Sequence, residues 1–483
     1  MVPTKNLFPL LVSFILCFCS CNSGNGNQDA GATTQAAATV LPQAYDLTLV
    51  KGQIIDRVIC KDNGAVSYSL YLPGNYTVEK SYPCIYFFDA HARGSLPVSM
   101  YKDLAERYGF VLVGSNVSKN GTQWPVTNDG VKALMADTRA RIHLDRQQLY
   151  TSGFSGGSRV ASSVAIFDGG IAGVIGCAAG FPNVDQGVQN KFDYFGMVGD
   201  FDFNLTEMVK LDEGLEQNGF THQLLTSDGI HGWAHAVDFE TGLLWMQVCA
   251  MKEKRQAKND TLIGALKKDM DRRIVAARHG GEWIKEQELL AGAVRIFSGL
   301  QDVSIYQKQL TELMNGGDYK NAIATREPLE RQEMNGQQEL GRQFTQQDKK
   351  WWAAKIAELN RNANNAKTKQ ESQMYQRLLN YLGLVGYMTV THALAAGDLD
   401  HAATYLEVFR MADPKNPDCP YLKAVYFMQK GDKTKAIASL DEAAGAGYSE
   451  LATLTTNAVF ADIRDDAGFK DVVAKVWANN KAK

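Results

Sequence analysis

The chain has 483 residues, of which 45% are hydrophobic and 21% are charged, and its formal net charge is −3. This length exceeds what a single hydrophobic core fills, so we expect two domains in addition to any processing segment. The near balance of positive and negative charges does not indicate the basic face that nucleic-acid binding requires, and we therefore expect no nucleic-acid partner.

The N-terminus has the pattern of a bacterial lipoprotein signal peptide. Lys5 supplies a positive charge, and residues 7–18 form an apolar stretch that is too short to span a bilayer. Ser20 is a small residue directly before Cys21, and a polar segment follows. We predict a signal peptide over residues 1–21 and a lipid on Cys21, which would anchor an otherwise soluble protein in the bacterial cell envelope. A plain secretory signal that is cleaved nearby is the alternative.

Residues 22–42 are rich in small and polar residues and are predicted to form a disordered tether. Over residues 43–251, short apolar runs then alternate with segments of helical spacing, which predicts an α/β domain with a mostly parallel sheet covered on both faces. The expected strands are Val66–Leu72, Cys84–Phe88, Phe110–Gly114, Gln148–Thr151, Gly173–Cys177, Tyr194–Val198 and His222–Thr226. The expected helices are Val98–Tyr108, Asp129–His143, Ser158–Phe167, Leu205–Asn218 and Ala234–Met251.

Residues 252–483 contain no convincing strand and are predicted to form a helical domain. Within it, Gly397-Asp398 recurs 34 residues later as Gly431-Asp432, and 34 residues is the period of a two-helix tetratricopeptide repeat. We predict such repeats, clearest over residues 383–450, and they would offer a surface to a protein partner. A generic helical bundle is the alternative. We expect a fragment that ends near residue 251 to fold alone and to retain the activity of the chain, because its sheet supplies its own core.

The most informative motif is Gly-x-Ser-x-Gly, formed by Gly153, Ser155 and Gly157 between an expected strand and an expected helix. A serine in this position lies on a sharp, strained turn, and the flanking glycines let the strand and the helix approach each other. The N–H of Gly156 and the helix dipole would then stabilise an oxyanion. We predict Ser155 as a nucleophile, and a loop rich in glycine and serine is the alternative.

A nucleophilic serine requires a base and a carboxylate that orients the base. In this kind of sheet the acid comes first along the chain and the histidine second. After the strand Tyr194–Val198 we favour Asp202, because its spacing places it one turn beyond the strand end, and Asp200 is the alternative. His231 lies in a loop between glycines after the last strand and is the predicted base. His235, its near competitor, is expected within the following helix.

A second oxyanion donor is expected in the loop after the strand Cys84–Phe88. A backbone N–H between Ala90 and Arg93 is the candidate, and Ala92 is the predicted donor, together with Gly156. His91 is expected to have a structural role in this loop.

These motifs resemble those of the α/β-hydrolase superfamily, in particular its esterase and polyester-depolymerase-like branch. The resemblance covers less than half of the chain. It implies a serine hydrolase with Ser155, Asp202 and His231 as catalytic triad, no cofactor or metal, and an ester substrate such as an esterified carbohydrate or a related polymer. Ala92 departs from the His-Gly that the family usually carries in the oxyanion loop. A peptidase with the same triad and a non-catalytic binding protein that uses the repeats are the competing functions. The motifs that carry the resemblance are Gly153-Phe154-Ser155-Gly156-Gly157, Gly199-x-x-Asp202-Phe203-Asn204 and Asp228-Gly229-x-His231-x-Trp233.

Overall fold

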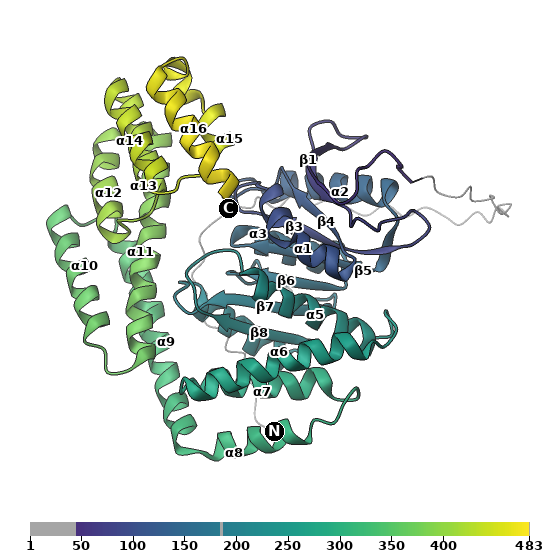
Figure 1. Cartoon of the computed structure of the whole chain (residues 1–483). Coiled ribbons are helices and arrows are strands. Elements are labelled where there is room, and N and C mark those ends of the chain that lie inside the picture. The colour runs from purple at the N-terminus through teal and green to yellow at the C-terminus, as the bar shows by residue number, and fades with distance from the viewer. Residues whose placement is uncertain (1–44, 184–186, 483) are drawn as a thin grey trace, which may run out of the picture. The chain divides into compact units, whose positions relative to one another are not determined.

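The computed structural model describes residues 45–183 and 187–482, and Figure 1 shows the course of the chain. The predicted signal peptide with Cys21 and the tether over residues 22–42 lie outside the described residues. From Tyr45 onward the chain forms one compact unit.

The described residues contain one eight-stranded mixed sheet, in the order β1-β2-β4-β3-β5-β6-β7-β8. β1 pairs with β2, and β2 with β4, in antiparallel fashion, whereas the neighbours from β4 to β8 are parallel. This topology confirms the predicted α/β-hydrolase fold. Because parallel strands end at one edge, the loops after β3, β5, β7 and β8 meet there. The strands are β1 (Ile54–Ile59), β2 (Ser67–Tyr71), β3 (Tyr82–Phe88), β4 (Val111–Ser115), β5 (Leu144–Phe154), β6 (Gly173–Cys177), β7 (Asp193–Gly199) and β8 (His222–Ser227).

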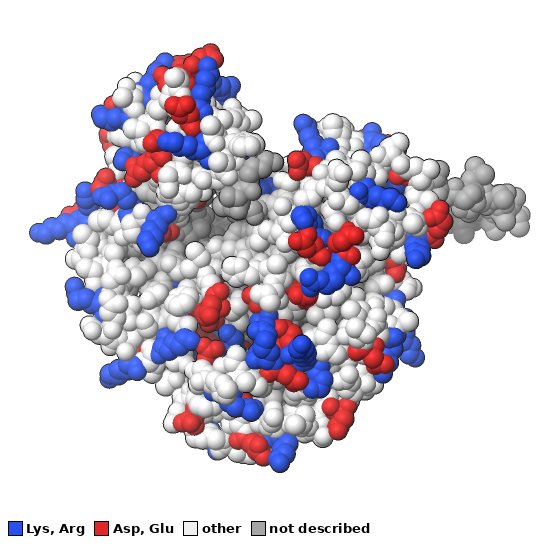
Figure 2. Space-filling model, viewed as in Figure 1, with Lys and Arg blue, Asp and Glu red and all other residues white. Residues whose placement is uncertain are grey.

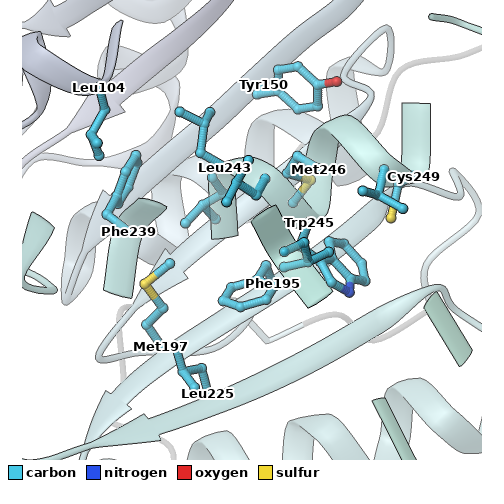
Figure 3. Close-up of a cluster of buried hydrophobic side chains, with 14 of the residues drawn as sticks. Leu104, Tyr150, Phe195, Met197, Leu225, Phe239, Leu243, Trp245, Met246 and Cys249 are labelled. Atoms are coloured by element: carbon cyan, nitrogen blue, oxygen red, sulfur yellow. The ribbon is translucent and has the colours of Figure 1, made fainter. Parts of the chain in front are cut away.

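Helices cover both faces of the sheet. α1 (Ser95–Tyr108) and α5 (Ala236–Lys252) pack on one face, and α2 (Trp124–Arg141), α3 (Gly156–Ser163) and α4 (Leu205–Gln217) pack on the other. Figure 3 shows how Phe195 of β7 and Trp245 of α5 meet in the first of these cores. Burying one large apolar side chain in this way stabilises the fold by about 1.5–3 kcal/mol.

Each strand expected from the sequence is present, and β1 is a strand that the sequence analysis missed. The reason is local: Asp56 and Arg57 interrupt its apolar residues, and the pairing register shifts between Ile55 and Val58. Such a bulge breaks the two-residue alternation by which a half-buried strand is recognised. β5 is also longer than expected, since it begins at Leu144.

The helices after Met251 share the core of the sheet. Leu266 of α6 (Asp260–His279), Leu290 of α7 (Trp283–Phe297) and Tyr306 of α8 (Ser304–Asn315) are buried in the same cluster as Trp245. α7 lies close against the edge strand β8, because a Cβ added to Gly292 would be 1.8 Å from the amide oxygen of Gln223. Residue 251 therefore ends the last helix of the α/β pattern but does not end the hydrophobic core.

This shared core changes the expectation for a truncated chain. We predict that a fragment of residues 43–251 lacks a cooperative thermal transition, because it exposes the apolar surface that α6 and α7 cover. A fragment of residues 43–316, which keeps α6 to α8, is the control and should melt cooperatively in circular dichroism. Cooperative melting of the shorter fragment would contradict the prediction.

The remaining described residues form helices. Gly397 and Gly431 end their helices with φ values of +73° and +77°, which are left-handed conformations suited to glycine. Asp398 and Asp432 then cap the next helices by accepting the N–H groups of residues 401 and 435. The two Gly-Asp pairs thus occupy equivalent places in successive helical hairpins, and their assignment as tetratricopeptide repeats stays a prediction. The helices are α9 (Gly317–Gln343), α10 (Lys349–Asn364), α11 (Lys369–Ala395), α12 (Leu399–Ala412), α13 (Asp418–Gln429), α14 (Lys433–Gly445), α15 (Leu451–Thr456) and α16 (Ala467–Ala482).

The surface charges are mixed. Figure 2 shows positive and negative side chains interspersed on the face that it presents, often side by side. Among the helices of the described residues, none combines the length and the apolar character needed to cross a membrane.

Candidate active site

Ser155 occupies a strained turn between β5 and α3. Its φ of 55° and ψ of −122° are rare for a residue with a side chain, and its N–H donates to the carbonyl of Cys177 at 3.0 Å. The flanking glycines are required by close backbone contacts. A Cβ on Gly153 would lie 2.1 Å from the carbonyl oxygen of Gly157, and one on Gly157 would lie 1.9 Å from the carbonyl oxygen of Phe88. The turn therefore has the geometry that the motif predicts for a presented serine hydroxyl.

The structure joins Ser155, His231 and Asp202 by hydrogen bonds. Nε2 of His231 lies 2.9 Å from Oγ of Ser155, and Nδ1 lies 3.0 Å from each carboxylate oxygen of Asp202. The side chain of Asp202 is 0% exposed and that of His231 is 18% exposed. Asp202 also accepts the N–H of Asn204 at 2.8 Å. This arrangement can pass a proton from the hydroxyl to the imidazole while a buried carboxylate orients the ring.

The carboxylate of the alternative acid, Asp200, makes no hydrogen bond to His231. Its carboxylate lies 4.0 Å from Nζ of Lys285, on α7. Burial raises the pKa of Asp200 above its ordinary value, and the charge of Lys285 acts in the opposite direction. The structure thus brings Asp202, rather than Asp200, to His231. The sequence predicted His235 inside the following helix, but it is an exposed residue that directly precedes the helix, and its side chain makes no capping hydrogen bond.

Two aromatic rings contact the imidazole of His231. The ring centroids of Phe154 and Phe203 lie 4.8 Å and 4.3 Å from that of His231. Phe203 in turn contacts Tyr381 of α11, with ring centroids 6.3 Å apart. These contacts restrict the orientations of the imidazole.

The loop after β3, where a second oxyanion donor is predicted, forms a tight turn. The N–H of Ala92 donates to the carbonyl of Asp89 at 3.1 Å, and the N–H of His91 donates to the Asp89 carboxylate at 2.8 Å. Ala92 has a φ of 60°, so the loop makes a tight turn that uses this N–H internally. In this conformation the N–H of Ala92 is used within the turn, and its role as an oxyanion donor stays a prediction. Gly156 begins α3, where an N–H has no intrahelical acceptor, and stays the predicted donor.

Asp89 and Trp233 form a connection that the sequence analysis missed. The buried carboxylate of Asp89 accepts two hydrogen bonds from Arg93, at 2.7 Å and 2.9 Å, and one from the indole N–H of Trp233 at 2.8 Å. Although burial acts to raise the pKa of Asp89, these hydrogen bonds and the charge of Arg93 hold it below its ordinary value. The connection ties the loop after β3 to the loop that carries His231. The sequence carried one signal for the pair of Asp89 and Arg93, namely a carboxylate directly after a strand and four residues before an arginine.

Within residues 45–183 and 187–482, no group of three or more His, Cys, Asp or Glu side chains is arranged to hold a metal ion.

The solved structures that the chain is similar to share little sequence identity with it. No protein-family model matches the sequence, and no curated protein matches it significantly. An S-formylglutathione hydrolase from Staphylococcus aureus is 12% identical, with 41% of this chain and 99% of that chain covered and a TM-score of 0.34. A fluorophosphonate-binding serine hydrolase from the same organism is 14% identical, with 41% and 99% covered and a TM-score of 0.35. A ferulic acid esterase is 17% identical, with 40% and 95% covered and a TM-score of 0.32.

Proposed function

We propose that this protein is a serine carboxylic-ester hydrolase with Ser155 as nucleophile, His231 as general base and acid, and Asp202 as the orienting carboxylate. The observation that carries the proposal is the hydrogen-bonded chain from Oγ of Ser155 through the imidazole to the buried Asp202, with distances of 2.9 Å and 3.0 Å. The strained conformation of Ser155 at the start of α3 supports it independently, because such strain persists where function requires it.

The proposed reaction has two stages, acylation of the serine and hydrolysis of the acyl-enzyme. Oγ of Ser155 attacks the ester carbonyl carbon while Nε2 of His231 takes the hydroxyl proton, and the N–H of Gly156 stabilises the carbonyl oxygen as it becomes negative. Asp202 holds Nδ1–H and stabilises the imidazolium. The leaving alcohol takes the proton from Nε2, and the acyl group stays on Ser155. His231 then deprotonates a water molecule, which attacks the acyl carbon. The bond from the acyl carbon to Oγ of Ser155 breaks, Oγ takes the proton back from Nε2, and the acid leaves.

The test of this function is covalent labelling with a fluorophosphonate, followed by mass spectrometry of the tryptic peptides. The adduct should be found on Ser155, and Ser155→Ala should abolish it. A folded wild-type chain that takes no label would contradict the proposal and would favour the binding-protein function.

The substrate class is a finer proposal. We propose an ester of a carbohydrate or a related polymer, and a panel of acetyl, feruloyl and short-chain acyl esters tests it. Hydrolysis of nitroanilides at rates comparable to those of matched nitrophenyl esters would instead favour a peptidase. If the protein hydrolysed only small soluble esters, the proposal of a polymer substrate would be contradicted.

We also propose that a lipid on Cys21 anchors the protein in the bacterial cell envelope. Cys21→Ser should release the protein from the membrane fraction or block its processing, because the thioether for the lipid is lost. Cys19→Ser is the matched control and should leave both unchanged, since bulky Phe18 precedes that cysteine. Fractionation with immunodetection measures the outcome. If the Cys21→Ser variant stayed in the membrane fraction and was processed as wild type, the proposal of a lipid anchor on Cys21 would be contradicted.

A further inference from the structure

We propose that the helices α9 and α11 supply positioning residues for the catalytic acid. Gln337, Arg377 and Asn380 donate hydrogen bonds to the backbone loop that carries Asp202, and through this loop they hold its carboxylate against His231. The helical part of the chain would then be a component of the active site. This inference rests on the proposed function.

The loop after β7 depends on these side chains for its backbone hydrogen bonds. The carbonyl groups of residues 199, 202 and 204 accept N–H groups of residues 202, 205 and 208 within the loop and α4. The carbonyl groups between them accept side-chain donors instead. Nη1 of Arg377 donates to the carbonyl of residue 200 at 2.8 Å, Nδ2 of Asn380 to that of residue 201 at 2.7 Å, and Nε2 of Gln337 to that of residue 203 at 2.8 Å. Buried carbonyl groups need such partners, so the helices stabilise this loop conformation.

Arg377 is itself held in a fixed orientation. Its guanidinium pairs with Glu333 of α9 through two hydrogen bonds, at 2.8 Å and 2.7 Å, and the two side chains are 9% and 1% exposed. A buried bidentate pair of this kind is rigid, and removing one partner leaves a buried charge uncompensated. The ion pair thus fixes the remaining donor of Arg377 on the loop.

Asp202 is part of this loop, so the position of the loop sets the distance and the angle between the Asp202 carboxylate and the imidazole of His231. Asp202 lies between the carbonyl groups that the helices bind, and the ring of the adjacent Phe203 contacts both His231 and Tyr381 of α11. Displacements of about 1 Å in catalytic groups can cost about a hundredfold in rate. Loss of the helical donors should therefore lower turnover without removing a group that touches the substrate.

A second contact joins the helical part of the chain to the loop after β3. Nη1 of Arg93 pairs with Glu450, which lies at the N-terminus of α15, at 2.6 Å. Arg93 also binds Asp89, which in turn binds Trp233 in the loop of His231. The helical part of the chain thus contacts the loop of the acid directly and is connected to the loop of the base through Arg93 and Asp89.

The experiment replaces the amide donors by acids of the same shape. In the double variant Asn380→Asp/Gln337→Glu, carboxylate oxygens face the two carbonyl groups, while the Arg377–Glu333 pair stays intact. The matched control is Gln376→Glu/Gln338→Glu, which adds the same charge to the same helices at exposed positions. Steady-state kinetics on nitrophenyl acetate and the rate of fluorophosphonate labelling are measured for the full-length chains, together with thermal melting.

We expect kcat and the labelling rate of the double variant to fall by about 10- to 100-fold, with KM within about twofold of wild type. The control should match wild type. If the double variant does not fold, Asn380→Ser, which shortens the donor without adding charge, takes its place with the same expectation. Equal kcat in test and control variants would overturn the inference, as would a change confined to KM. A wild-type chain without esterase activity or label would instead overturn the proposed function.

Discussion

Replacing Ser155 or His231 by alanine is expected to lower kcat for nitrophenyl acetate by about a millionfold, because triad members act as a unit. For the same reason the double variant should be no slower than either single variant. The residual rate should reflect the remaining oxyanion donor and substrate binding alone. Stopped assays with long incubation are needed to measure rates this low.

Matched controls separate catalysis from folding. Ser152→Ala removes a buried hydroxyl of β5, the strand that precedes Ser155. This hydroxyl has no hydrogen-bond partner within the described residues, so kcat of the variant should be near that of wild type. His235→Ala alters an exposed residue at the start of α5 and should also be near wild type. If Ser155→Ala kept full activity, the hydrolase function would be wrong.

The second prediction with a large expected effect compares the kcat values of variants at the two aspartates after β7, Asp202 and Asp200. Asp202→Asn should lower kcat by about ten-thousandfold, because an amide in contact with Nδ1 favours the wrong imidazole tautomer. Asp200→Asn should stay near wild type, since its carboxylate lies 4.0 Å from Lys285 and has no hydrogen bond to His231. Both substitutions preserve shape, so comparing the two kcat values isolates the chemistry. The reverse result would exchange the roles of the aspartates and leave the enzyme class intact.

Much of the fold could be predicted because its signals are local. Apolar runs such as Gly173–Cys177 are buried strands in the structure, at the predicted position. β1 escaped prediction because a bulge and two charged residues break its pattern. The Gly-x-x-Asp spacing pointed to Asp202 because the chain needs one turn after β7 before a side chain can face His231.

The parts of the site that could not be predicted depend on distant pairs or on the details of a turn. Arg377 and the carbonyl that it binds are 177 residues apart in the sequence, and a single sequence carries no local signal for such a contact. Ala92 was assigned by its place in a motif, whereas its N–H is used inside a tight turn that only the backbone conformation reveals. The shared core of α6 and α7 likewise requires knowing where the edge strand β8 lies.

The hydrogen bonds from α9 and α11 to the acid loop also bear on when the protein acquires activity during synthesis. A ribosome completes Ser155, Asp202 and His231 before it has made residues 337–380, which bind the loop. Since domains fold as the chain emerges from its N-terminal end, the early sheet would stand for a time with its acid loop unsupported. The nascent hydrolase would then remain weakly active until the helical segment had been translated and docked.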